Sequence, residues 1–116
     1  MPDELKIVFD PQHDGVAVAH FSGRLDFTSA LVARDQFAAA VAAGQRKLIV
    51  DLSKVGFVDS AGLGSLIGGM RAARQAGGDL RIANPSEQAE MLLSLTSLDQ
   101  VLKIHSSLEE AVSDFS

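Results

Sequence analysis

The segment Lys47–Leu52, with the sequence KLIVDL, most constrains how this chain can fold. It is an almost continuous run of aliphatic and β-branched residues, which is typical of a strand buried on both faces of a sheet. Strands of this kind occur mainly in parallel sheets whose faces are covered by helices. The segment therefore predicts a central strand in an α/β domain.

Strand and helix patterns alternate on both sides of this segment. Two β-rich runs, Leu5–Asp10 and Val16–Phe21, flank a turn that ends in Asp14-Gly15, and they predict an antiparallel hairpin. Further strands are expected over Leu80–Ala83 and Gln100–Ile104, and helices over residues 27–43, 59–75, 84–95 and 106–112. This order predicts one α/β domain over residues 1–116. We expect a mixed, mostly parallel sheet of about five strands, with about four helices mainly on one face.

Polar residues mark the expected helix starts. Asp26 or Thr28 is expected to cap the first helix, and Gly44 to end it. Asn84, followed by Pro85 and Glu87, predicts the start of the third helix, and Ser106 with Glu109 forms a capping box for the fourth. Residues 53–58 are expected to form a loop between the central strand and the second helix.

Composition excludes several classes of site. The chain has no cysteine, and its three histidines are scattered singly, so we expect no metal site and no cofactor. The net charge of −5 differs from that of proteins that bind nucleic acids or anionic membranes. Residues 82–116 carry six acidic side chains against Lys103 alone. This acidic part is interpreted either as a solvated helical surface or as a surface that attracts a basic partner.

No segment of the sequence approaches the roughly 18 uninterrupted apolar residues of a membrane span. The N-terminal residues MPDE are acidic where a signal peptide would be basic. We therefore expect a protein that stays in the cytoplasm and does not enter a membrane.

The segment Val58–Ser65, with the sequence VDSAGLGS, joins the central strand to the second helix. Open α/β sheets place their sites at the carboxyl ends of strands, and the first turn of a helix offers free N–H groups to a phosphate. Ser60 at this junction could therefore hold a covalent phosphoryl group. The alternative is that Ser60 or Asp59 is only a helix cap.

The second helix has two unlike faces. One face is apolar and is expected to pack against the sheet: Leu63, Leu66, Ile67, Met70 and Ala73. The opposite face has only small side chains: Ala61, Ser65, Gly68, Gly69 and Ala72. Gly62 and Gly64 are two further glycines in the same helix. Each glycine inside a helix costs about 0.5–1 kcal/mol of stability relative to alanine. The small face predicts a surface on which another protein docks closely, and the alternative is tight packing within the domain.

Together these motifs resemble the STAS domain, and specifically a stand-alone bacterial anti-sigma factor antagonist. Val58–Gly64 is similar to the family's D-S-[SA]-G-L-G motif around a phosphorylated serine, and Gly23–Asp26 resembles its G-x-L-D element. Gly77–Ile82 and Ser97–Ile104 resemble the family's segments at the last two strands, with Ser97 where glycine is usual. Arg24 stands where many members have an acidic or polar residue.

The resemblance implies a regulatory protein that is not an enzyme. In such a switch the unphosphorylated protein binds an anti-sigma factor, which is also a serine kinase of the histidine-kinase-like type, and a sigma factor is released. Phosphorylation of Ser60 ends the binding, and a serine phosphatase restores it. A weak homodimer is also allowed. The expected partner surface combines the motif, the small helix face and nearby side chains: Asp26, Phe57, Asp59, Ser60, Ala61, Gly62, Gly64, Ser65, Gly68 and Gly69.

Three alternative functions fit parts of the pattern. A phosphoaspartate receiver needs an acidic pair after an early strand, and the end of Val16–Phe21 has none. A serine hydrolase needs a base near Ser60, and neither His20 nor His105 has recognisable partner chemistry in the sequence. The third alternative is a STAS scaffold that is not phosphorylated, or one that binds a small ligand.

Overall fold

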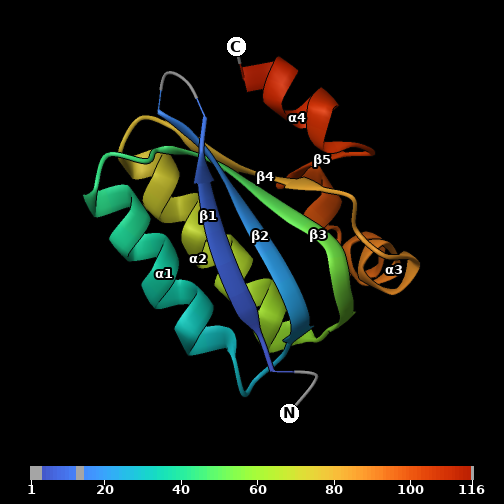
Figure 1. Ribbon diagram of the computed structural model, residues 1–116. Helices are drawn as coiled ribbons and strands as arrows, with labels where there is room; N and C mark the ends of the chain where they lie inside the picture. The colour runs from blue at the N-terminus through green and yellow to red at the C-terminus, as the bar shows by residue number, and fades with distance from the viewer. Residues whose placement is uncertain (1–3, 13–14, 116) are drawn as a thin grey trace.

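The computed structural model describes residues 4–12 and 15–115, so the expected turn at Asp14 lies partly outside the described residues. These residues form strands and helices in the predicted order (Figure 1). The elements are β1 (Lys6–Pro11), β2 (Val16–Leu25), α1 (Ala30–Ala42), β3 (Lys47–Val58), α2 (Ser60–Gln75), β4 (Asp79–Ala83), α3 (Glu87–Leu95), the 3₁₀ turn η1 (Leu98–Gln100), β5 (Lys103–His105) and α4 (Leu108–Phe115).

The sheet has the strand order β1-β2-β3-β4-β5. β1 runs antiparallel to β2, and the other neighbouring strands pair in parallel, which confirms the mixed, mostly parallel sheet. β5 begins later than the expected Gln100–Ile104, because Leu98–Gln100 forms a 3₁₀ turn.

Helices α1, α2 and α3 share one hydrophobic core on one side of the sheet. Figure 1 shows α1 and α2 side by side there, with α4 on the opposite side of the sheet. Phe37 of α1, Leu66 of α2 and Leu93 of α3 are all fully buried in this larger core. Ala111 of α4 belongs to a smaller, separate cluster. The prediction of helices mainly on one face is therefore confirmed. Among the described residues, no helix has both the length and the apolar character of a membrane-spanning segment.

The central strand is longer than the sequence suggests. Residues 53–58, expected to be a loop, continue β3 as far as Val58. The reason is that β2 also continues, to Leu25, and pairs with β3 through Leu25 and Val58. Two shifts of register in β2, one beside Gly23, accommodate the irregular sequence, and Gly23 adopts a φ of +103° that favours glycine. The segment before Ser60 is therefore held in the sheet.

Helices α1, α3 and α4 begin later than expected, and α1 starts at Ala30 instead of residue 27. The hydroxyl of Ser86 accepts a hydrogen bond from the N–H of Ala89, so Ser86 caps α3. Asn84, the expected cap, has a φ of +53°, outside the range of a cap residue. In α4 the hydroxyl of Ser107 accepts from the N–H of Glu110, one residue beyond the predicted capping box.

Candidate functional site

Asp59 organises the end of the sheet where β2 and β3 stop. One carboxylate oxygen accepts a hydrogen bond from the N–H of Gly62 at 2.8 Å, so Asp59 caps α2. The other oxygen accepts from the N–H of Phe27 at 3.1 Å. The N–H of Asp59 itself donates to the carbonyl of Leu25 at 3.2 Å. One side chain therefore fixes the start of α2 against the connection between β2 and α1.

Ser60 is the first residue of α2 and is exposed. Of the two residues considered as caps, Asp59 is the cap and Ser60 is not. The Ser60 hydroxyl has no hydrogen-bond partner among the described residues. It lies where the helix dipole favours a negative charge. Ser60 thus presents a free nucleophilic oxygen at a position that tolerates a phosphoryl group.

Asp26 was expected to contact a partner, but it is only 7% exposed and is buried in the domain. Its carboxylate accepts hydrogen bonds from the Thr28 hydroxyl at 2.6 Å, the Thr28 N–H at 3.0 Å and Arg24 Nε at 3.2 Å. The Thr28 hydroxyl and Arg24 hold the pKa of Asp26 below its ordinary value, against the opposing effect of burial. Asp26 is therefore ionised at neutral pH and shapes the turn between β2 and α1.

The cap expected at Asp26 or Thr28 falls instead on Ser29. The Ser29 hydroxyl makes no capping bond to the helix. It donates to the carbonyl of Arg24 at 2.9 Å and accepts from the N–H of Asp26 at 3.1 Å. The polar side chains before α1 therefore bind within the turn and leave the first helical N–H groups without a side-chain cap.

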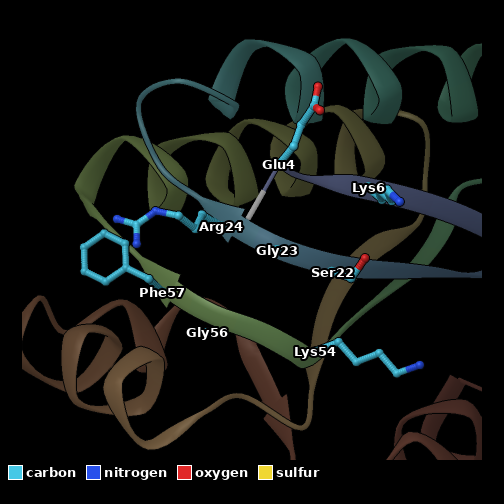
Figure 2. A pocket seen from close by; sticks show the side chains of 8 residues that line it. All are labelled: Glu4, Lys6, Ser22, Gly23, Arg24, Lys54, Gly56 and Phe57. Atoms are coloured by element: carbon cyan, nitrogen blue, oxygen red, sulfur yellow. The ribbon is translucent and has the colours of Figure 1, made fainter. Parts of the chain in front are cut away.

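Phe57 lies half-buried near the end of β3 and contacts Arg24 across the sheet. The Arg24 guanidinium carbon lies 4.5 Å from the centre of the Phe57 ring, within the range of a cation–π contact (Figure 2). Because Arg24 also donates to Asp26, its side chain connects the Phe57 ring to the turn before α1.

The small face of α2 is covered by the domain itself, so the prediction that it is an open docking surface is wrong for Gly62, Ser65 and Gly69. All three are buried. A Cβ added to Gly62 would lie 2.1 Å from the carbonyl oxygen of Leu25, and one added to Gly69 would lie 2.6 Å from the ring of Phe37. These residues are small because α1 and the end of β2 pack directly on them.

A narrower strip of α2 stays accessible. Ser60 is exposed, and Ala61, Gly64 and Gly68 are half-buried. Ala61, Gly64 and Gly68 lie three and four residues apart, which places them along one side of the helix, and Ser60 adjoins Ala61 at the helix start. A Cβ added to Gly64 would meet no atom within 4 Å, whereas one added to Gly68 would lie 3.4 Å from Arg34 Nε. The strip is the part of the predicted surface that another protein could reach.

Two exposed apolar residues at and before the start of α1 were missed by the sequence analysis. Phe27 is 76% exposed and Leu31 is 69% exposed, although both are large and apolar. The bond from the Phe27 N–H to Asp59 places Phe27 next to the start of α2. The sequence did contain a sign of this exposure. Leu31 does not share the helical spacing of the buried residues Ala33 and Phe37, so it lies on another side of α1.

Gln88 of α3 is a further residue that the sequence analysis missed. Its side-chain oxygen accepts from the N–H of Val58 at 2.9 Å, and its nitrogen donates to the Val58 carbonyl at 2.7 Å. Both backbone groups at the last position of β3 are satisfied in this way, two residues before Ser60. Gln88 therefore ties α3 to the last residue of β3, just before the start of α2.

The two histidines considered as bases for a hydrolase contact other groups. His20 Nδ1 lies 3.0 Å from Asp51, and His105 Nδ1 lies 3.2 Å from Glu110. Neither histidine contacts Ser60 among the described residues, so Ser60 has no histidine base there. No group of three or more potential metal ligands occurs among the described residues.

Comparison with known proteins is consistent across sequence and structure. Residues 10–111 match the family model of the STAS domain. The chain is 29% identical over 101 residues to the anti-sigma-B factor antagonist of Bacillus subtilis, a match that covers 87% of this chain and 92% of that protein. It is 34% identical over 71 residues to a Thermotoga maritima protein assigned as an anti-sigma factor antagonist, covering 61% of this chain and only 63% of that relative's length.

The fold also matches solved structures. The crystal structure of an anti-sigma factor antagonist from Mycobacterium paratuberculosis aligns with a TM-score of 0.86 at 27% sequence identity. This alignment covers 99% of the present chain and 97% of that one.

Proposed function

Because the chain belongs to the STAS domain family, we propose that it is an anti-sigma factor antagonist controlled by phosphorylation of Ser60. The unphosphorylated form binds an anti-sigma factor that is also a serine kinase of the histidine-kinase-like type, and a sigma factor is released. Phosphorylation of Ser60 dissociates the complex, and a serine phosphatase restores binding. The chain acts by binding in the cytoplasm and needs no cofactor.

The observation that carries this proposal is the free, exposed hydroxyl of Ser60 beside an aspartate that already caps the helix. In the transfer step the Ser60 oxygen bonds to the γ-phosphorus of ATP, the bond from that phosphorus to the bridging oxygen breaks, and ADP leaves. Both oxygens of Asp59 are occupied by backbone N–H groups. The kinase therefore supplies the base that takes the hydroxyl proton.

The charge of the phosphoryl group explains how one modification ends binding. Phosphoserine adds a charge of about −1.5 to −2 at neutral pH. The N-terminus of α2 stabilises this charge within the domain. The adjoining surface, however, consists of small and apolar residues such as Ala61, Gly64 and Phe27, beside the carboxylate of Asp59. A desolvated contact on that surface loses affinity when a dianion is placed in it, while the fold persists.

The structure changes which residues we assign to the partner surface. We propose that the accessible strip makes the contact: Ser60, Ala61, Gly64 and Gly68. Phe27 and Leu31 extend it as apolar anchors, and Phe57 and Asp59 lie at its margin. Asp26, Gly62, Ser65 and Gly69 support its shape from within the domain.

Phosphorylation by an anti-sigma kinase tests this function. The purified chain is incubated with ATP and a kinase of the histidine-kinase-like anti-sigma type, and the modified residue is identified by mass spectrometry. We expect one phosphoryl group on Ser60, none in Ser60→Ala, and normal modification in Ser94→Ala, which changes an exposed serine of α3. Binding of the kinase without modification of Ser60 would instead favour an unphosphorylated scaffold.

A further inference from the structure

The outer face of the sheet, opposite α1 and α2, is covered only in part. Ala111 of α4 packs on Val16, Val18, Ile49 and Ala83. Toward the carboxyl ends of β2 and β3, residues of β1, β2 and β3 line a groove that no helix of the described residues fills (Figure 2).

Strand register places three polar side chains in a row across this groove. Lys6 of β1 pairs with Ser22 of β2, and Ser22 pairs with Lys54 of β3. Neighbouring strands lie about 4.8 Å apart, so the Cα atoms of the two lysines are separated by about 10 Å. Lysine side chains are long and flexible enough for both ammonium groups to reach one anion between them, with the Ser22 hydroxyl below it.

These three side chains have no partners of their own among the described residues. Lys6 and Lys54 form no ion pair in that part of the chain, and the Ser22 hydroxyl makes no hydrogen bond there. By contrast, Lys103 lies 2.7 Å from Asp114. Glu4 is the acidic residue of the lining, and Figure 2 shows its carboxylate pointing away from Lys54. The groove is therefore positively charged on a chain whose net charge is −5.

The remaining walls leave room for an anion. Gly23 and Gly56 contribute no side chain, and a Cβ added to Gly56 would meet no atom within 4 Å. Arg24 is paired with Asp26 and stacked on the Phe57 ring, and Figure 2 shows its side chain at the opposite end of the groove from that of Lys54. Arg24 therefore closes that end of the groove, and the two lysines supply the unpaired positive charge.

We propose that this groove binds a phosphate group through Lys6, Ser22 and Lys54, either as free phosphate or as the phosphate ester of a small molecule. Two ammonium groups and a hydroxyl match the charge and the acceptor oxygens of a phosphate dianion. The proposal does not rest on the function of Ser60.

Binding is measured by amide NMR, with inorganic phosphate, glycerol 3-phosphate and AMP as separate probes. We expect saturable shifts of the Gly23 and Gly56 amide signals. Lys6→Gln and Lys54→Gln should each weaken binding about fivefold. Lys47→Gln is the matched control, because it removes the same charge from the opposite end of β3. Both groove lysines are exposed, so melting temperatures should not change.

The probes distinguish the two sources of the phosphate group. Equal affinity for all three probes would show that the groove recognises the phosphate group alone. Tighter binding of AMP or glycerol 3-phosphate would show that the ligand is a phosphate ester. Absence of saturable shifts at Gly23 and Gly56 with every probe overturns the proposal. So does an equal loss of affinity in Lys47→Gln, because it would indicate attraction by general charge alone.

Discussion

The carboxylate of Asp59 accepts a hydrogen bond from the backbone N–H of Phe27 at 3.1 Å, although the two residues are 32 positions apart in the sequence. The same carboxylate caps α2, the helix that begins with Ser60. A single side chain therefore links the backbone of Phe27 to the helix start that carries Ser60. This link connects two parts of the proposed partner surface, the turn before α1 and the start of α2.

Replacing Asp59 should weaken that unit. Asp59→Ala removes the cap and leaves the Phe27 N–H without its acceptor, so we expect a loss of about 1–2 kcal/mol in the free energy of unfolding. Asp59→Asn retains a good cap through one oxygen and should lose less. Urea denaturation measures both, with Asp99→Ala, an exposed aspartate of η1, as the control. Equal stability of the alanine variant and the parent would show that the link contributes nothing.

Substitutions of Ser60 should separate binding from stability. Ser60→Ala should bind the anti-sigma factor and cannot be phosphorylated, so the sigma factor stays free. Its stability should change by less than about 0.5 kcal/mol, because Asp59 is the cap. Ser60→Asp adds a charge that the helix dipole tolerates, so it should melt like the parent but bind weakly. Calorimetric titration beside thermal denaturation checks both, and equal affinities would contradict the electrostatic switch.

Two glycines of α2 should respond in opposite ways. Gly69→Arg should unfold the domain, because even a Cβ at this position would lie 2.6 Å from the Phe37 ring. Gly64→Ala should stabilise it by up to about 1 kcal/mol, because a Cβ there meets open space and alanine favours the helix. Circular dichroism during heating measures both changes. A folded Gly69→Arg variant would return this residue to the accessible surface.

Substitutions of the exposed apolar residues Phe27 and Leu31 should reduce partner binding without reducing the stability of the domain. Phe27→Ser and Leu31→Ser remove little buried surface from the free protein, so the melting temperature should stay close to that of the parent. Each should weaken binding of the anti-sigma factor by about 1–2 kcal/mol if it anchors the interface. Leu95→Ser, which changes a residue that is 77% exposed at the end of α3, is the control. An equal effect of all three substitutions would argue against the assignment.

The attachment of α4 should depend on acidity. The Lys103 ammonium, 2.7 Å away, and Arg81, 2.8 Å away, hold the pKa of Asp114 below its ordinary value. A carboxyl group whose pKa is lower in the folded state stabilises the fold above its unfolded pKa, and this contribution is lost as the pH falls below about 4. Asp114→Asn should therefore be less stable than the parent at neutral pH and lose less on acidification. Urea denaturation at several pH values tests this, and parallel curves would contradict it.

The sequence by itself determined the order of elements and the place of the candidate site. Continuous aliphatic runs specify buried strands, and a carboxylate before a helix specifies its start, because both depend on residues close together in the chain. The KLIVDL strand and the position of Ser60 at the start of α2 follow from such local patterns, whereas the structure was needed to choose Asp59 over Ser60 as the cap.

Only the tertiary structure decided which atoms cover each surface. A helix face of small residues accepts another protein or a neighbouring helix equally well, and here α1 with Phe37 fills the space beside Gly69. Asp26 looked like an interface carboxylate, but Thr28 and Arg24 enclose it. The row of Lys6, Ser22 and Lys54 likewise depends on strand register. Packing and register join residues that are distant in the sequence, so no local pattern contains them.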